Sequence, residues 1–399
     1  MTKPTLSGIQ ARIESWDARK WRRAVLATAA LALLARAVVI AVTGGGFNLR
    51  IFHYFGGLIA RGVNPYDAPP GGEFDPRYGD NPPPELLLFA GLLEIHDSPD
   101  TLRVFFALAD GAVIATVGLW YPRSRTFRAN FIAFYAFNPL MLEAWTGFAD
   151  DKALLLLCTI GVLAGLDAGR LALSWGSAIA LAALKWYSVV FAPALALHSA
   201  RLRSRGWTVA ACLAFVGVVA LAQLPYLPDS LDAFARRSDR ISIDPPIHAA
   251  ITQLLAEVNL YSTLIPRVFW PLSLGTVYAL YLLRKIDIKD TVVLSVFCSY
   301  IALPDEGFNR MLLITLPFLF LIGMSLWRWT VLWFLSILAA GAVLVEFRDV
   351  DLDLAESLFG AYGSLEHVVF VNVVMVAVLV FYLRDRLGAS GPGAVEATP

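Results

Sequence analysis

Apolar runs long enough to form membrane helices recur along most of this chain, and short polar turns separate them. A spanning helix needs about 20 mainly apolar residues, so the pattern predicts an all-α integral membrane protein with about twelve transmembrane helices. One polytopic domain is expected over 24–386, after a cytoplasmic segment at 1–23 and before a disordered cytoplasmic tail at 387–399. The predicted spans are 24–43, 104–121, 131–147, 153–166, 171–184, 186–198, 207–224, 268–283, 291–303, 311–326, 329–345 and 367–383.

Composition agrees with a multi-pass membrane protein and excludes an ordinary soluble domain. The chain is 58% apolar and 16% charged, and its mean hydropathy is +0.64, values typical of polytopic membrane proteins. Cys158, Cys212 and Cys298 all lie in apolar stretches, where small core residues are expected and not a disulfide framework or metal cluster. The first span lacks a small-residue cleavage site, so it is predicted to be retained.

Basic residues predict the orientation, because short cytoplasmic turns collect lysine and arginine. All clusters lie inside when the stretch 171–198 is split at Lys185 and the apolar stretch 84–95 lies along the outer interface. Both termini are then cytoplasmic. The clusters placed inside are Arg123, Arg125 and Arg128; Arg201, Arg203 and Arg205; Arg284, Lys285 and Lys289; Arg328; and Arg384 and Arg386. Asp110, inside a span, must face a polar partner, and Arg36 is the expected one.

The segment 44–103 is the longest polar interruption in the first half of the chain. It is rich in proline, yet its apolar and aromatic residues argue against disorder. We expect an extracytoplasmic cap with interfacial helices, joined on the same side by a second loop at 225–267. The inner turns are too short for a nucleotide-binding domain, and the chain has neither the glycine pattern of one nor a feature that indicates nucleic-acid binding.

Three features follow one another in a fixed order. An amphipathic stretch precedes Gly62, Pro65 and Tyr66 (G-x-x-P-Y) and the run NPPPELLLFAGL; next comes NPLMLEAWTGFADDKALLLL, and last a small-residue helix that ends at Lys185. Over roughly residues 24–200 this order resembles the polytopic GT-C glycosyltransferases. The similarity is to the GPI mannosyltransferase I catalytic subunit and to bacterial polyprenol-phosphate-mannose-dependent mannosyltransferases.

The resemblance implies transfer of a sugar, mannose or a similar one, from a polyprenyl-phosphate donor to a lipid or glycan acceptor on the extracytoplasmic side. A first-loop carboxylate would take the acceptor proton, with Asp80, Asp75 and Asp67 as candidates in that order. Cations would stabilise the leaving phosphate, and the candidates are Lys185, Arg236, Arg237 and Arg240. Residues expected to line the cavity are Asn48, His53, Tyr66, Glu143, Asp150, Asp151 and His248.

The chain departs from the family at the catalytic carboxylate, because Asn48 stands at the second acidic position and Gly46 at the first. An amide cannot act as a base, so another outer carboxylate does this work or the chain is a non-catalytic scaffold or lipid-binding subunit. A transporter of lipid-linked sugars is a third class, disfavoured because no internal repeat is found. Because the paired acidic motif is missing, no cofactor is assigned, and the question of whether a divalent metal is needed stays open. An alternative role for Lys185 is simply to extend its ammonium group from a helix end to the lipid headgroups.

Overall fold

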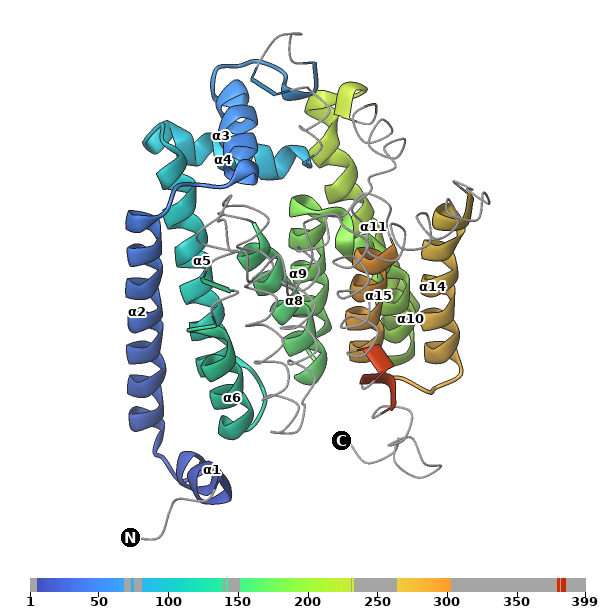
Figure 1. The fold of residues 1–399 in the computed structure, drawn as a ribbon. Helices are drawn as coiled ribbons and strands as arrows, with labels where there is room; N and C mark the ends of the chain where they lie inside the picture. Colours follow the sequence, from blue (N-terminus) through green and yellow to red (C-terminus); the bar gives the residue numbers. More distant parts are fainter. Residues whose placement is uncertain are drawn as a thin grey trace, which may run out of the picture. The chain divides into compact units, whose positions relative to one another are not determined.

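The computed structural model (Figure 1) describes residues 6–67, 73–74, 81–138, 141–142, 151–230, 232, 264–302, 379–380 and 382–384. Every regular element in these ranges is helical, so the all-α prediction is confirmed for them. Three helical stretches among them are long and apolar enough to cross a membrane, namely Ala18–Val42, Pro99–Trp120 and Arg205–Tyr226. The spans predicted at 311–326 and 329–345 and most of 367–383 lie outside the described residues, so the total of about twelve stays a prediction.

The chain divides into two compact units. The first comprises 1–79, 84–180 and 316–340, and the second 80–83, 181–315 and 341–399. In the first unit α5 is central, since α2, α3, α6 and α8 all contact it, while α1 packs on α6. The helices that begin in this unit or at its edge are α1 (Leu6–Glu14), α2 (Ala18–Val42), α3 (Phe47–Ala60), η1 (Pro65–Asp67), α4 (Pro83–Ile95), α5 (Pro99–Trp120), α6 (Arg125–Tyr135), α8 (Lys152–Asp167) and α9 (Leu171–Leu184).

Local sequence signals explain where several of these helices begin. The Asp17 carboxylate accepts a hydrogen bond from the Lys20 amide at the start of α2, and the Ser124 hydroxyl does the same for the Phe127 amide in α6. At the start of α5, Ser98 caps the helix and Pro99 occupies its first turn. These side chains satisfy amide groups that lack a partner within the helix.

α2 and α5 run antiparallel, and polar contacts fix their register. The Trp21 indole donates to the Gly118 carbonyl at 2.7 Å, and Arg103 donates to the Thr43 carbonyl at 2.8 Å near the other end of the pair. The chain therefore leaves α2 and enters α5 at the same end of the pair, where α3 and α4 lie (Figure 1). This geometry agrees with the expectation that the stretch 84–95 does not cross.

The polar partner that the sequence predicts for Asp110 is buried between α2 and α5. Arg36 Nε donates to Asp110 Oδ2 at 2.6 Å, and both side chains are fully buried. The Tyr135 hydroxyl donates to the other carboxylate oxygen, and Arg36 Nη1 donates to the Ala136 carbonyl at 3.0 Å. The predicted Arg36–Asp110 pairing is thus confirmed, and a neighbouring tyrosine completes it.

Two predicted spans are wrong as single α-helices. The helix predicted at 131–147 ends at Tyr135, followed by a turn, and Asn138 is not helical. The cause is Pro139, because a proline disfavours helical geometry at the residue before it and lacks an amide hydrogen. The span predicted at 186–198 instead begins as the 3-10 helix η4 (Trp186–Val190), and α10 (Ala192–Leu202) follows.

The second unit contains the remaining described helices. They are η4, α10, α11 (Arg205–Gln223), η5 (Leu224–Tyr226), α14 (Leu264–Leu282) and α15 (Ile288–Ala302). α15 packs against α14, α10 and η4, and α10 packs on α11. The Trp270 indole of α14 donates to the Ser299 hydroxyl of α15 at 3.2 Å. The Tyr382 hydroxyl donates to Asp290 at the start of α15, so a C-terminal residue belongs to this packing.

Candidate functional site

Lys185 occupies a turn between α9 and η4, as the division of the stretch 171–198 predicted. Its backbone is extended, with φ −152° and ψ 148°, and its amide donates to the Leu181 carbonyl at 2.7 Å. At the end of η4 the Val190 carbonyl accepts a hydrogen bond from the Tyr278 hydroxyl of α14 at 2.8 Å. The turn is therefore anchored on both sides, and its backbone position is set by packing.

The Lys185 ammonium donates a hydrogen bond to the side-chain oxygen of Asn81. Asn81 is 5% exposed and directly precedes the three prolines that lead into α4. A lysine that only extends to lipid headgroups keeps its ammonium in water, whereas here the ammonium meets a buried amide. Hydrogen bonds with one charged partner are stronger than neutral ones. This bond joins the lysine turn to the proline-rich first loop.

Buried polar groups also lie close in sequence to both partners. The Ser188 side chain is fully buried, and within the described residues its hydroxyl has no hydrogen-bond partner. Leaving a buried hydroxyl without a partner costs free energy. Glu85 is fully buried in the first turn of α4, where the helix dipole favours a negative charge.

Asp151 and Lys152 form a buried ion pair where α8 begins. Lys152 Nζ lies 2.8 Å from Asp151 Oδ1, with side chains 4% and 0% exposed. Asp151 is therefore not a solvated turn residue. Buried carboxylates require a charge or hydrogen-bond partner, and the adjacent lysine supplies it. Whether Asp151 lines a donor cavity stays a prediction.

The other described site residues lie in the first unit. Asn48 is the second residue of α3 and is half-buried. His53, one turn further along α3, has Nε2 2.9 Å from Asp97 Oδ1, with the two side chains 32% and 73% exposed. Tyr66 is buried within η1, and Asp67 is exposed at the end of the same element. In the described part of the first loop, helical elements thus carry these polar residues, and the cap itself stays a prediction.

Eight predicted site residues lie outside the described part of the chain. They are Asp75, Asp80, Glu143, Asp150, Arg236, Arg237, Arg240 and His248. The structure in turn adds Asn81, Lys152 and Asp97, each holding a predicted residue by its side chain. The signal for Asn81 was its position before the proline run. For Asp97 no sequence pattern marks the pairing with His53.

Metal-binding geometry is absent from the described residues, which contain no group of three histidine, cysteine or acidic side chains able to hold an ion. All three cysteines are free, and Cys298 is buried. Comparison with known protein families, curated proteins and solved structures gave no match. The fold and these polar groups define a helical protein with apolar helices long enough to cross a membrane.

Proposed function

We propose that this chain is an integral membrane glycosyltransferase of the GT-C type. It transfers a mannose-like sugar from a polyprenyl-phosphate donor to a lipid or glycan acceptor on the extracytoplasmic side. The order of sequence motifs over roughly residues 24–200 supports the class. The observation that carries the proposal is the hydrogen bond from Lys185 to Asn81, because it sets a cation at the end of an apolar helix against the polar loop.

Each proposed role follows from the chemistry of sugar transfer. A first-loop carboxylate removes the proton of the acceptor hydroxyl as that oxygen bonds to the anomeric carbon. The bond from this carbon to the donor phosphate breaks, and the phosphate leaves with increased negative charge. Lys185 and the Ser188 hydroxyl supply hydrogen-bond donors for that charge. Asp80 is the first choice of base, since it directly precedes Asn81 in the chain.

One observation favours a second function, which is binding of the lipid-linked sugar without transfer. Asn48 lies in the first turn of α3, where the resemblance implies a catalytic carboxylate. An amide there can hydrogen-bond a sugar hydroxyl but cannot accept its proton. A non-catalytic relative would retain the lysine turn and lack the base.

Binding and transfer are separated by measuring both in membranes supplied with radiolabelled polyprenyl-phosphate mannose. Lys185→Ala is expected to weaken donor binding by about 1.5–3 kcal/mol, the contribution of a hydrogen bond to a charged group. Lys285→Ala is the control, because Lys285 is an exposed lysine at the turn between α14 and α15. Asp80→Asn is expected to abolish transfer with donor binding intact.

The outcomes distinguish the two functions. The enzyme hypothesis is supported if the natural chain transfers sugar and if Asp80→Asn or Lys185→Ala removes this transfer. Saturable donor binding without transfer, lost in Lys185→Ala, supports the binding subunit, and Asn48→Asp then tests whether a carboxylate restores activity. Unchanged donor affinity in Lys185→Ala contradicts the anchoring role in both.

A further inference from the structure

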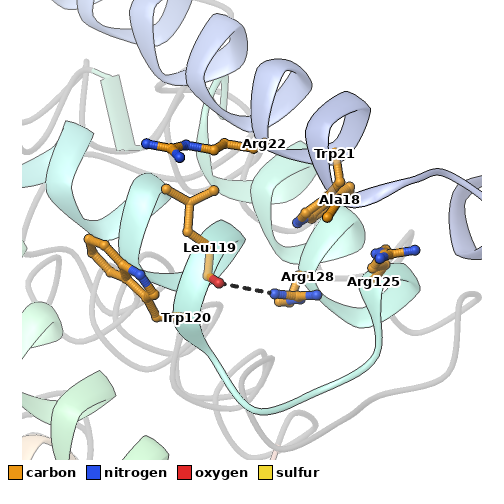
Figure 2. Close-up of a pocket in the computed structure, with 7 residues that line it drawn as sticks. All are labelled: Ala18, Trp21, Arg22, Leu119, Trp120, Arg125 and Arg128. Atoms are coloured by element: carbon orange, nitrogen blue, oxygen red, sulfur yellow. Dashed lines mark hydrogen bonds between the residues drawn. The ribbon is translucent and has the colours of Figure 1, made fainter.

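The first unit contains a cavity of about 400 Å³ at the end opposite α3 and α4. Figure 2 shows the side chains of three helices converging on it. Its lining consists of Ala18, Trp21 and Arg22 from α2, Leu119 and Trp120 from α5, and Arg125 and Arg128 from α6. The three arginines are its charged residues, and the lining includes no acidic side chain.

Two of these guanidinium groups are held in place by backbone carbonyls. Arg128 Nη1 donates to the carbonyls of Gly118 at 3.2 Å and Leu119 at 3.4 Å, the latter bond being the dashed line of Figure 2. Its guanidinium also lies over the Trp21 ring, 5.3 Å from the centroid. Arg125 Nη1 donates to the Glu14 carbonyl at 2.9 Å. Carbonyls orient a guanidinium but leave its full positive charge.

The nearby Glu14 carboxylate acts on Arg125 and Arg128 through its charge, but one carboxylate cannot balance three arginines. Glu14 Oε1 accepts a hydrogen bond from the Thr126 amide at 2.7 Å. Within the described residues no ion pair joins Arg22, Arg125 or Arg128 to a carboxylate, and Arg128 Nε is buried without a hydrogen-bond partner. Burial and the neighbouring charge of Arg125 lower the pKa of Arg128, against the opposing effect of Glu14. The cavity thus concentrates positive charge.

An apolar surface continues from this cavity along α2. Leu26 lies one turn beyond Arg22 on the same face and is 46% exposed, and Leu34 further along is 62% exposed. At the end of α5 the Trp120 ring is 73% exposed. Exposed tryptophans at the ends of apolar helices are typical of membrane interfaces. Cationic groups thus border surfaces suited to hydrocarbon.

We propose that this cavity binds the phosphate headgroup of an anionic glycerophospholipid, with its acyl chains along the exposed faces of α2 and α5. Arginine is suited to this because its planar group donates two parallel hydrogen bonds to a phosphate. Arg22 is exposed at the rim, whereas Arg125 and Arg128 are half-buried. The site is independent of sugar transfer, since it lies at the other end of the unit from the first loop.

The test is native mass spectrometry of the full chain in a neutral detergent, titrated with dioleoyl phosphatidylglycerol. One saturable lipid is expected, and Arg22→Gln should weaken its binding at least about tenfold, the loss of one hydrogen bond to a charged group. The matched control is Arg23→Gln, an exposed neighbour on α2 that does not line the cavity. It should change affinity by less than about threefold, well below a specific contact. The thermal unfolding midpoint of each variant checks that it is folded.

Two further ligands identify what the site selects. Dioleoyl phosphatidylcholine has the same acyl chains without net charge and is expected to bind more weakly than phosphatidylglycerol. Inorganic phosphate alone is expected not to compete at millimolar concentration, because it lacks the acyl contribution. The proposal is overturned if both lipids bind equally, if Arg22→Gln and Arg23→Gln have equal effects, or if inorganic phosphate displaces the lipid completely.

Discussion

Replacing Asp110 with alanine is expected to destabilise the first unit by about 3–5 kcal/mol, the cost of leaving one member of a buried ion pair without its partner. Both Arg36 and Asp110 are fully buried, with Nε and Oδ2 2.6 Å apart. Without the carboxylate, Arg36 keeps hydrogen bonds to the Ala32 and Ala136 carbonyls. These neutral groups do not balance its charge, and the Tyr135 hydroxyl loses its acceptor.

A double-mutant cycle measures the pair itself. Arg36→Met is expected to destabilise by a similar amount, because it leaves the carboxylate buried. The double variant Arg36→Met with Asp110→Ala removes both charges, so its cost should fall well below the sum of the two single variants. We expect a coupling energy of at least about 2 kcal/mol, within the range for residues in one network.

The assay is reversible unfolding in mixed detergent micelles, followed by tryptophan fluorescence. Asp100→Ala is the control, since Asp100 lies in the same helix and pairs with Arg103 at 3.1 Å but is 66% exposed. Because the Asp100 carboxylate is largely in water, its pair with Arg103 is expected to contribute only about 0–1 kcal/mol. The reasoning is refuted if Asp110→Ala costs no more than Asp100→Ala, or if the cycle is additive within about 0.5 kcal/mol.

Two further predictions concern packing and pH. Gly165→Ala should destabilise the α8–α9 hairpin by about 1–3 kcal/mol, because a Cβ there would lie 2.7 Å from the Ser174 backbone nitrogen. At Gly176 in the same hairpin a Cβ would enter open space, so Gly176→Ala should stabilise the hairpin by about 0.5–1 kcal/mol in the same unfolding assay. A hydrogen bond from the Thr126 amide lowers the pKa of Glu14 below its ordinary value of 4.5. The stability that this bond contributes is therefore present above pH 4.5 and is lost as the pH falls through the lower pKa of the folded state. The hydrogen-exchange protection factors of α1, taken relative to the intrinsic rates at each pH, should therefore fall in acid, and Glu14→Gln should remove most of that pH dependence; an unchanged acid response in the variant would contradict it.

Long apolar periodicity predicted the helices that stand alone in the sequence. The spans expected at 24–43, 104–121 and 171–184 correspond to α2, α5 and α9, with bounds that agree within a few residues. The larger differences occur at helix starts, since α2 and α5 begin with polar residues that cap the first turn. Hydropathy reports which residues prefer lipid, and it does not detect capping in flanking polar turns.

Breaks inside apolar stretches were harder to predict. Pro139 was visible in the sequence, yet its apolar surroundings favoured a continuous helix over 131–147. The turn at Lys185 was predicted, because an unpaired charge is costly at mid-bilayer, but the 3-10 geometry after it was not. η4 contacts α15, and its Val190 carbonyl accepts a hydrogen bond from Tyr278 of α14. Such tertiary contacts leave no local signal in the sequence.

Side-chain pairs mark the limit of sequence reasoning at the candidate site. The Arg36–Asp110 pair was predictable, because a charge inside a span needs a partner and few charges were available. Lys185 and Asn81 lie 104 positions apart, and neither residue type in its own context specifies the other. The pairing of Lys185 with Asn81 is therefore seen only in the structure.

The register of α2 against α5 separates the arginine cavity from the first-loop helices α3 and α4. Contacts at Trp21 and Arg103 near the two ends and at Arg36 between them match these helices along their length. A helix of the 25 residues of α2 is about 37 Å long, which exceeds a hydrocarbon core of about 30 Å. If α2 crosses the bilayer, the arginine cavity and the cap formed by α3 and α4 therefore lie at opposite interfaces. The lining of the cavity includes neither Lys185 nor Asn81, so loss of lipid binding in Arg22→Gln should leave donor binding at Lys185 unchanged.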